Sequence, residues 1–392
     1  MSPKKLSPST GYLTIYSSQC WVMHLLGPYL MLWMENVGLS FTEIGITQAV
    51  FMFTILATDF PAGGLADRYG RRLNYAVGML LYGLGILTIS LSKSFMSILA
   101  GFVFCGVGSA FMSGSFMAWF YDAAGDEKLA YKTFSKAQVL EGIMGASAGI
   151  IASTLSSILL NLPLVLSAIV AVLTFFLTIL LLNENYGHGG KKNYWSLLKD
   201  GGVQILKNRV LNILIISGFF MSFVLPTFML YWIILAQKYY GLSTEYAGGI
   251  YSILIISMTI GGVISIYLSR KTDYKTIAIV VTALWGFLFV ILPLSVTLIQ
   301  VILMLVLVEV LYAIRTAAMS TFENVVIPTV GRAITLSALS TIIGAFSILA
   351  NTVIGVIADN YGIKALYQYV GIFAFLSALC LFLAYLWSKK YR

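Results

Sequence analysis

Residues 63–72 read GGLADRYGRR and lie at the junction of two apolar stretches, residues 44–65 and 73–92. Each stretch is about 20 residues long, the length an α-helix needs to cross the ~30 Å hydrocarbon core of a bilayer. Backbone amides find no water in that core, so a helix that satisfies them internally is expected. The junction therefore predicts two membrane-spanning helices joined by a short basic loop.

The same alternation of apolar stretches and short polar loops continues along the whole chain. Of the 392 residues, 59% are hydrophobic and 10% are charged, whereas a soluble protein has roughly a quarter charged residues. The predicted spans are residues 12–34, 44–65, 73–92, 95–121, 133–158, 163–183, 210–237, 246–269, 277–295, 298–322, 333–357 and 365–388. The chain is therefore predicted to be an all-α integral membrane protein with twelve transmembrane helices.

A longer basic segment, residues 184–209, divides these spans into two groups of six. The connection FMAWFYDAAGDEKLAYKTFSKAQ (116–138) of the first group resembles AMSTFENVVIPTVGRAITLSALS (318–340) of the second. We therefore predict two pseudo-repeated six-helix bundles, residues 1–183 and 210–392, with the solute site between them near the midplane. The linker, 184–209, is predicted to contain a helix at the cytoplasmic membrane interface.

The distribution of basic residues predicts the orientation. With these spans, twenty Lys and Arg residues fall on one side of the membrane, and only Lys93, Lys238 and Lys364 fall on the other. Basic residues concentrate in cytoplasmic loops, so both termini are predicted to be cytoplasmic and the protein to lie in the cell membrane. Topology explains the net charge of +9, and nucleic-acid binding is not expected.

The segment 63–72 closely resembles the signature loop of the major facilitator superfamily, Gly-x-x-x-Asp-Arg-x-Gly-Arg-Arg. The resemblance implies the major facilitator fold, alternating-access transport of a small solute, and a latch for the outward-facing state at this loop. We expect its glycines to allow a tight turn, and Asp67 to pair with Arg71 or to meet a helix N-terminus. A basic loop that only fixes topology is the alternative. The predicted gating motif comprises Asp59, Gly63, Gly64, Asp67, Arg68, Gly70, Arg71 and Arg72.

Two signatures of the proton-driven drug antiporters of this superfamily are incomplete. Those proteins carry an Arg and a Gln before Gly-x-Gly in the fourth span, where this chain has Phe102 and Cys105. They also carry Gly-Pro in the fifth span, where Ala146 replaces the proline. Standard drug–proton antiport is therefore not expected. Over a short stretch, LLGPYLMLW (25–33), the chain resembles the molybdate-anion transporter group.

Ionisable side chains inside the predicted spans are candidate functional groups, because an unpaired charge in the bilayer core costs several kcal/mol. Arg315 can bind an oxyanion through its planar guanidinium, or can form a structural ion pair. Its candidate structural partners are Glu141, Asp59 and Glu309. Glu141 and Glu309 are candidate proton carriers, because a carboxylate held away from water can change protonation near neutral pH. Glu141 can instead be a structural partner of Arg315 or Lys136.

Other polar and aromatic residues of the spans are candidates for lining a solute cavity. With Arg315 and Glu309, they are Gln19, His24, Tyr29, Tyr231, Trp232 and Asn351. His24 titrates in the range that suits a proton carrier, although a lone histidine in a helix is more often a hydrogen-bonded packing residue.

These features favour a proton-coupled secondary active transporter of a small molecule. An uncoupled facilitator, a drug-type exporter and a non-transporting membrane receptor are the alternatives. An enzyme is not expected, because only His24 and His188 are available and no nucleophile–His–acid set is evident. Cys20, Cys105 and Cys380 lack metal-ligand spacing, so neither metal nor cofactor is expected. The expected partners are the solute, the lipid bilayer and protons, and the protein is expected to be a monomer.

Overall fold

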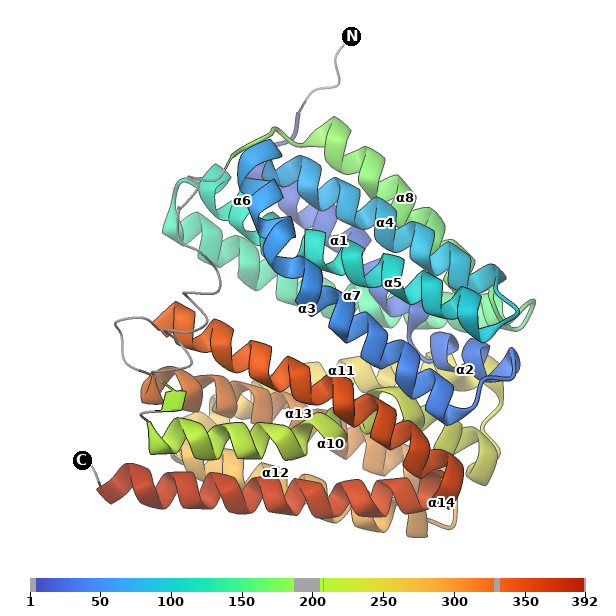
Figure 1. Ribbon diagram of the computed structural model, residues 1–392, viewed down its shortest axis with the longest axis vertical. Coiled ribbons are helices and arrows are strands. Elements are labelled where there is room, and N and C mark those ends of the chain that lie inside the picture. Colours follow the sequence, from blue (N-terminus) through green and yellow to red (C-terminus); the bar gives the residue numbers. More distant parts are fainter. Residues whose placement is uncertain (1–4, 187–204, 207, 328–331, 391–392) are drawn as a thin grey trace. The chain divides into compact units, whose positions relative to one another are not determined.

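The computed structural model describes residues 5–186, 205–206, 208–327 and 332–390, and the regular elements of that part of the chain are helices (Figure 1). Within these described residues, ten helical segments are long and apolar enough to cross a membrane, as expected for a multi-pass membrane protein. The helices are α1 (Pro8–Leu26), α2 (Tyr29–Asn36), α3 (Phe41–Tyr69), α4 (Arg71–Leu91), α5 (Phe95–Met112), α6 (Ser115–Ala124), α7 (Glu127–Ser156), α8 (Leu162–Leu181), α10 (Arg209–Tyr240), α11 (Thr244–Ser269), α12 (Tyr274–Ile291), α13 (Leu298–Val326) and α14 (Arg332–Lys390).

Several helices begin at side chains that accept hydrogen bonds from their first free amides. Ser7, Ser94 and Asp126 cap α1, α5 and α7 in this way. Asn208 caps α10, and Thr297 opens α13 with a capping box. Such residues satisfy amides that have no partner inside the helix, so polar loops set where the apolar helices start.

Two predicted spans are interrupted. The first, residues 12–34, breaks between α1 and α2, where Gly27 adopts φ 26° and Pro28 has no amide hydrogen to donate. The fourth, residues 95–121, breaks between α5 and α6, where Gly114 adopts φ 68°. Both were predicted as continuous helices, because the apolar character of the chain continues through backbone positions that only glycine accepts easily.

The last two predicted spans meet directly. Residues 358–364 were expected to form a loop between them, but α14 (Arg332–Lys390) consists of two helices that meet at a kink at Gly362 (φ 80°, ψ 163°), so the two spans are separate and only the loop is missing. A single glycine in this conformation bends the chain without a connecting loop.

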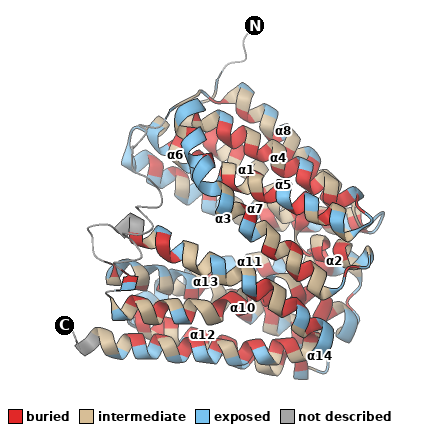
Figure 2. Ribbon diagram, viewed as in Figure 1, coloured by how far each residue is buried: buried red, intermediate tan, exposed pale blue. Residues whose placement is uncertain are grey.

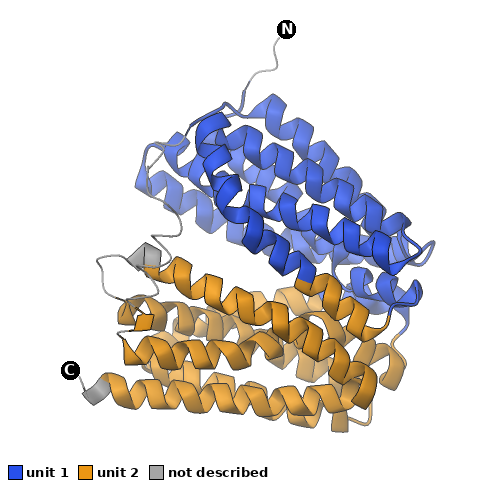
Figure 3. Cartoon of the chain, viewed as in Figure 1, with its two compact units in different colours: residues 1–39, 50–191, 243–252 blue, residues 40–49, 192–242, 253–392 orange. Residues whose placement is uncertain are grey.

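The chain forms two compact units (Figure 3). Unit 1 comprises Met1–Leu39, Val50–Lys191 and Ser243–Ser252; unit 2 comprises Ser40–Ala49, Lys192–Leu242 and Ile253–Arg392. Helices α3 and α11 therefore each contribute to both units. The boundaries 1–183, 184–209 and 210–392 stay a prediction, and most of the expected interfacial helix lies outside the described residues.

Each unit is held together by a central helix pair and its neighbours. In unit 1, α4 packs on α5 and α8, and α1 packs on α7 and α8. In unit 2, α14 packs on α10 and α12, and α12 packs on α13. Buried residues follow α4 along its length (Figure 2), so α4 is an enclosed helix of unit 1.

Two glycines allow α7 and the first turns of α11 to approach closely within unit 1. A Cβ atom on Gly248 would lie 2.2 Å from the backbone oxygen of Gly149, closer than real Cβ atoms come. The Ser252 hydroxyl donates to the Ala146 carbonyl at 2.7 Å across the same contact. The absence of a side chain is therefore what permits this packing.

Gly248→Ala is expected to destabilise the protein by about 1–3 kcal/mol, because the added methyl group collides with backbone that has little room to move. Thermal unfolding of the purified protein in detergent would measure the effect. Gly249→Ala is the matched control, since its Cβ would meet nothing within 4 Å. Equal melting temperatures for the two variants would contradict the close packing.

Candidate functional site

The signature loop is tighter than expected. Helix α3 continues to Tyr69 and α4 starts at Arg71, so Gly63 and Gly64 lie inside a helix and the expected turn at these two residues is wrong. Only Gly70 turns the chain, with φ 109° and ψ 141°. A glycine is needed at that one position because side chains rarely accept such a φ.

Arg71 forms ion pairs with two carboxylates near this turn. Its guanidinium lies 3.6 Å from the Asp67 carboxylate, which confirms the expected pair. It also contacts the Asp122 carboxylate and donates to the Ala118 carbonyl at 3.2 Å. Arg68 instead lies over the Tyr69 ring, 5.3 Å from its centre. Arg71 therefore ties the α3–α4 turn to α6.

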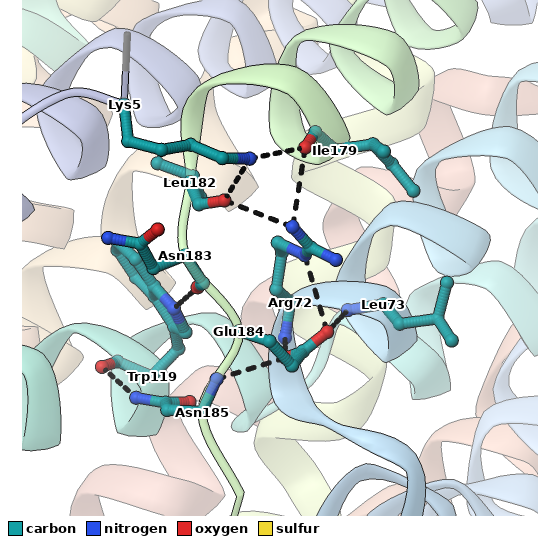
Figure 4. A network of polar contacts seen from close by, with 9 residues as sticks. All are labelled: Lys5, Arg72, Leu73, Trp119, Ile179, Leu182, Asn183, Glu184 and Asn185. Carbon is teal, nitrogen blue, oxygen red and sulfur yellow. Dashed lines mark hydrogen bonds and ion pairs between the residues drawn. The ribbon is translucent and has the colours of Figure 1, made fainter. Parts of the chain in front are cut away.

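Glu184, which follows α8, binds the start of α4 (Figure 4). Its carboxylate accepts hydrogen bonds from the backbone amides of Arg72 at 2.8 Å and Leu73 at 3.1 Å, and from Arg72 Nε at 3.3 Å. The first amides of a helix lack internal partners and form the positive end of its dipole, which a carboxylate complements. Sequence reasoning missed Glu184, because it lies 112 residues from Arg72.

Two cations bind the last carbonyl groups of α8 (Figure 4). Lys5 Nζ donates to the carbonyls of Ile179 at 3.0 Å and Leu182 at 2.8 Å. Arg72 Nη1 donates to the same two oxygens at 3.3 Å and 3.1 Å. Positive charge stabilises the C-terminal end of a helix. Arg72 therefore links the start of α4 to the end of α8, because its guanidinium binds both the Glu184 carboxylate and the last carbonyl groups of α8.

A second part of the same network orders the chain after α8. Trp119 Nε1 donates to the Asn183 carbonyl at 2.8 Å, and Asn185 Nδ2 donates back to the Trp119 carbonyl at 2.8 Å (Figure 4). The Asn185 carbonyl accepts from the Arg71 amide at 3.0 Å. Residues 183–185 thus join α4 and α6 within unit 1.

A cavity of about 320 Å³ lies beside α1 in unit 1. On α1 its wall is made by Tyr12, Tyr16, Gln19 and Met23, whose spacing of three or four residues places them on one helix face. The remaining lining residues come from α5, α6 and their junction: Ser109, Met112, Ser113, Gly114, Phe116 and Met117. The lining combines aromatic rings, thioethers, hydroxyls and one amide, and none of these side chains is charged.

Gln19, a predicted lining residue, is fixed in this wall. It accepts a hydrogen bond from Tyr75 Oη at 2.8 Å through its amide oxygen. The Phe116 ring stacks between those of Tyr12 and Tyr75, with centres 4.7 Å and 4.3 Å away. The wall is therefore built from rings that hold one another in place.

Glu141, a predicted proton carrier, lies on α7 one hydrogen bond away from this cavity. Its carboxylate accepts from Tyr16 Oη at 2.9 Å, and Tyr16 lines the cavity. The sequence suggested Lys136 or Arg315 as the structural partner of Glu141, but its hydrogen-bond partner in unit 1 is Tyr16.

His24 and Tyr29 are not among the residues that line this cavity. His24 Nδ1 is 2.9 Å from Tyr251 Oη, the hydrogen bond expected of a packing histidine. Tyr29 is fully buried and its hydroxyl accepts from the Gly248 amide at 2.9 Å. Both side chains connect α1 and α2 to the first turns of α11.

In unit 2, Glu309 and Arg315 are both buried residues of α13. Arg315 is 8% exposed, and its Nε donates to Thr282 Oγ1 on α12 at 3.0 Å. Glu309 is 9% exposed and makes no hydrogen bond or ion pair with any described residue. Within the described part of unit 2, Arg315 also has no ion pair, so the expected alternative of a pair with Glu309 is wrong.

The other predicted residues are on α3, α10 and α14. Tyr231 and Trp232 are buried on α10, and Tyr231 Oη donates to the Phe41 carbonyl at 3.4 Å. Asn351 is buried on α14 and donates to the Ser347 carbonyl of its own helix at 2.8 Å. Asp59 is exposed on α3. The hydrogen bonds of Tyr231 and Asn351 are those of packing residues.

Solved structures of transporters share this fold. The nucleoside transporter NupG aligns over 97% of this chain and 99% of its own, with a TM-score of 0.83 and 15% identity. A bacterial homologue of the human lysosomal transporter Spinster aligns over 96% of each chain, with a TM-score of 0.75 and 14% identity. At these identities the likeness concerns the fold alone.

Curated relatives match shorter parts of the sequence. The uncharacterized MFS-type transporter YxaM of Bacillus subtilis (strain 168) is 24% identical over 217 residues, 54% of each chain. The minor myo-inositol transporter IolF of the same organism is 35% identical over 80 residues, 20% of this chain and 18% of its own. The chain thus spans about half the length of the first relative. The family model of the Major Facilitator Superfamily matches residues 13–341, so this chain belongs to the Major Facilitator Superfamily of transporters.

Proposed function

We propose that this protein is a secondary active transporter that moves a small solute across the cell membrane by alternating access, coupled to protons. The observation that carries the coupling is the Glu309 carboxyl group, buried in a membrane-spanning helix without a partner among the described residues. A carboxylate there costs several kcal/mol, whereas the protonated form is neutral. Proton binding at Glu309 would therefore stabilise the conformation in which this carboxyl group is buried, and proton release would destabilise that conformation.

Glu141 is the second candidate proton carrier. Tyr16 donates a hydrogen bond to its carboxylate at 2.9 Å, and Tyr16 also lines the 320 Å³ cavity. Glu141 is therefore placed to sense the occupant of that cavity. Glu309 is the stronger candidate, because no such hydrogen bond supports its charge.

The twelve-span topology belongs to the same proposal. In the part of the chain that the structure describes, ten segments have the length and hydropathy of a span, and one of them, Thr335–Ser388, contains the non-helical Gly362. Counting that segment as two spans, and α1 with α2 as one, gives twelve. An even number places both termini on one side, and the basic loops favour the cytoplasm. We propose a monomer without enzymatic activity.

Transport measurements on reconstituted protein test the proposal. The purified chain would be placed in liposomes that contain a pH-sensitive dye and offered anionic, zwitterionic, cationic and neutral solutes. Myo-inositol and uridine belong to the panel because of the names of IolF and NupG. A proton flux that depends on one class of solute is the expected result. Equilibration of a labelled solute without proton movement would instead favour an uncoupled facilitator.

A further inference from the structure

The geometry points to an oxyanion subsite at Arg315, where Thr282 holds the guanidinium at Nε and leaves its two terminal nitrogens for a carboxylate or phosphate group of the solute. This inference rests on the proposed transport function and names the chemical class of its solute. It concerns α12 and α13 of unit 2 only.

The guanidinium of Arg315 is buried with most of its donors unused. The residue is 8% exposed, yet only Nε donates to a described residue. A guanidinium has five N–H donors and no acceptor, and the Nη1 and Nη2 groups have no hydrogen-bond partner among the described residues. Unmet donors of a buried cation are expensive, and the side chain persists best where a ligand or water meets them.

Thr282 fixes the direction of this group. Its hydroxyl donates to the Ala278 carbonyl at 2.7 Å, so its oxygen is oriented to accept from Arg315 Nε at 3.0 Å. Holding Nε leaves the terminal nitrogens together, and this planar edge matches the two oxygens of a carboxylate or phosphate. Thr282 acts here as a positioning residue.

The nearby charges do not explain Arg315 as a structural ion pair. Glu323 is close enough to act on it electrostatically, but the two form no ion pair. A second buried cation of unit 2 shows the contrast: Lys275 Nζ donates to Ser388 Oγ at 2.8 Å and lies 5.6 Å from the centre of the Phe322 ring. The Lys275 ammonium thus meets a hydroxyl and an aromatic ring, whereas the terminal nitrogens of Arg315 meet no polar group among the described residues.

An apolar wall lies one helical turn away. The rings of Trp285 and Tyr312 stack with centres 5.9 Å apart, three residues from Thr282 and Arg315 respectively. Trp285 is fully buried and its Nε1 donates to the Val308 carbonyl at 2.9 Å. Such a wall limits water beside the guanidinium, which strengthens charge-assisted hydrogen bonds to an anion.

Binding of matched pairs of probes tests the inference on the full-length protein in detergent. The pairs are benzoate with benzamide, glucuronate with glucose, and uridine monophosphate with uridine, so that a carboxylate source and a phosphate source are separated. Affinities would be measured by calorimetry or by ligand-induced thermal stabilisation. We expect at least one anion to bind about 10- to 100-fold tighter than its neutral partner.

Four variants distinguish the contributions of the planar guanidinium, of its positive charge and of the Thr282 hydroxyl to anion binding. Arg315→Gln should abolish the preference for the anion, and Arg315→Lys should weaken it although the charge remains, because the planar fork is lost. Thr282→Val should weaken anion binding, and Thr282→Ser, which keeps the hydroxyl, should restore it. Melting temperatures without ligand would show that each variant is folded.

Equal binding of an anion by wild type and folded Arg315→Gln would overturn the inference. So would neutral partners that bind as tightly as their anions, or a wild-type protein that binds no anion of the panel. Transport of the same pairs into dye-loaded liposomes distinguishes failure of the anion subsite from failure of the transport proposal. Transport of neutral members alone contradicts the subsite, whereas anion binding without transport of any solute contradicts the transporter.

Discussion

Glu309→Gln should abolish accumulation of the solute driven by a pH gradient, while exchange of labelled solute across the membrane continues. Gln has nearly the same shape and cannot exchange a proton. With one proton per solute, a gradient of one pH unit can support about tenfold accumulation, since 1.36 kcal/mol corresponds to one unit. The variant is expected to reach only equal concentrations on both sides. Uptake into proteoliposomes at imposed pH gradients measures the effect.

Two further variants serve as a control and as a test of the second candidate proton carrier. Glu127→Gln removes an exposed carboxylate in the first turn of α7 and should leave accumulation unchanged. Glu141→Gln tests the second candidate and replaces the group that Tyr16 binds. Full accumulation by both Glu309→Gln and Glu141→Gln would exclude these carboxylates as the coupling groups.

Glu184→Ala should lower the free energy of unfolding by about 2–3 kcal/mol, a large part of the stability of a typical domain. The substitution removes the acceptor of the Arg72 and Leu73 amides at the start of α4. It also leaves the Arg72 guanidinium without its ion pair, although that group keeps the carbonyls at the end of α8. Thermal or denaturant unfolding in detergent measures the loss.

Glu184→Gln is the matched control for that prediction. It keeps one acceptor oxygen for the amides but loses the charge that complements the helix end and the guanidinium. Its loss of stability should be clearly smaller than that of Glu184→Ala. Wild-type stability in the alanine variant would show that the network of Figure 4 does not hold unit 1 together.

Membrane thickness made most of the fold predictable. A helix must be long enough to cross the hydrocarbon core, so apolar run length located α4 or α13 to within a few residues. The breaks at Gly27 and Gly114 were missed because hydropathy contains no information about φ. For the same reason the glycines of the signature loop were misjudged: Gly70 turns the chain, whereas Gly63 and Gly64 continue a helix.

The candidate site was predictable only where partners are close in sequence. Asp67 and Arg71 are four residues apart on adjoining helix ends, and their pair was expected. Tyr16, the partner of Glu141, is 125 residues away, and Thr282, the partner of Arg315, is 33 residues away on another helix. The position of Arg315 inside an apolar span marked it as unusual from the sequence. The hydrogen bond that fixes its guanidinium could not be predicted, because it depends on how α12 and α13 pack.

The contacts of Lys5 have a consequence for biosynthesis. A chain is made from its N-terminus, so Lys5 is synthesised long before Ile179 and Leu182, the carbonyls that it binds. Until α8 has been made and inserted, nothing can hold Lys5 in its final place. These contacts of Lys5 therefore form only after Leu182 has been synthesised, and a nascent chain that stops before α8 lacks both this contact and the cap that Glu184 provides for α4.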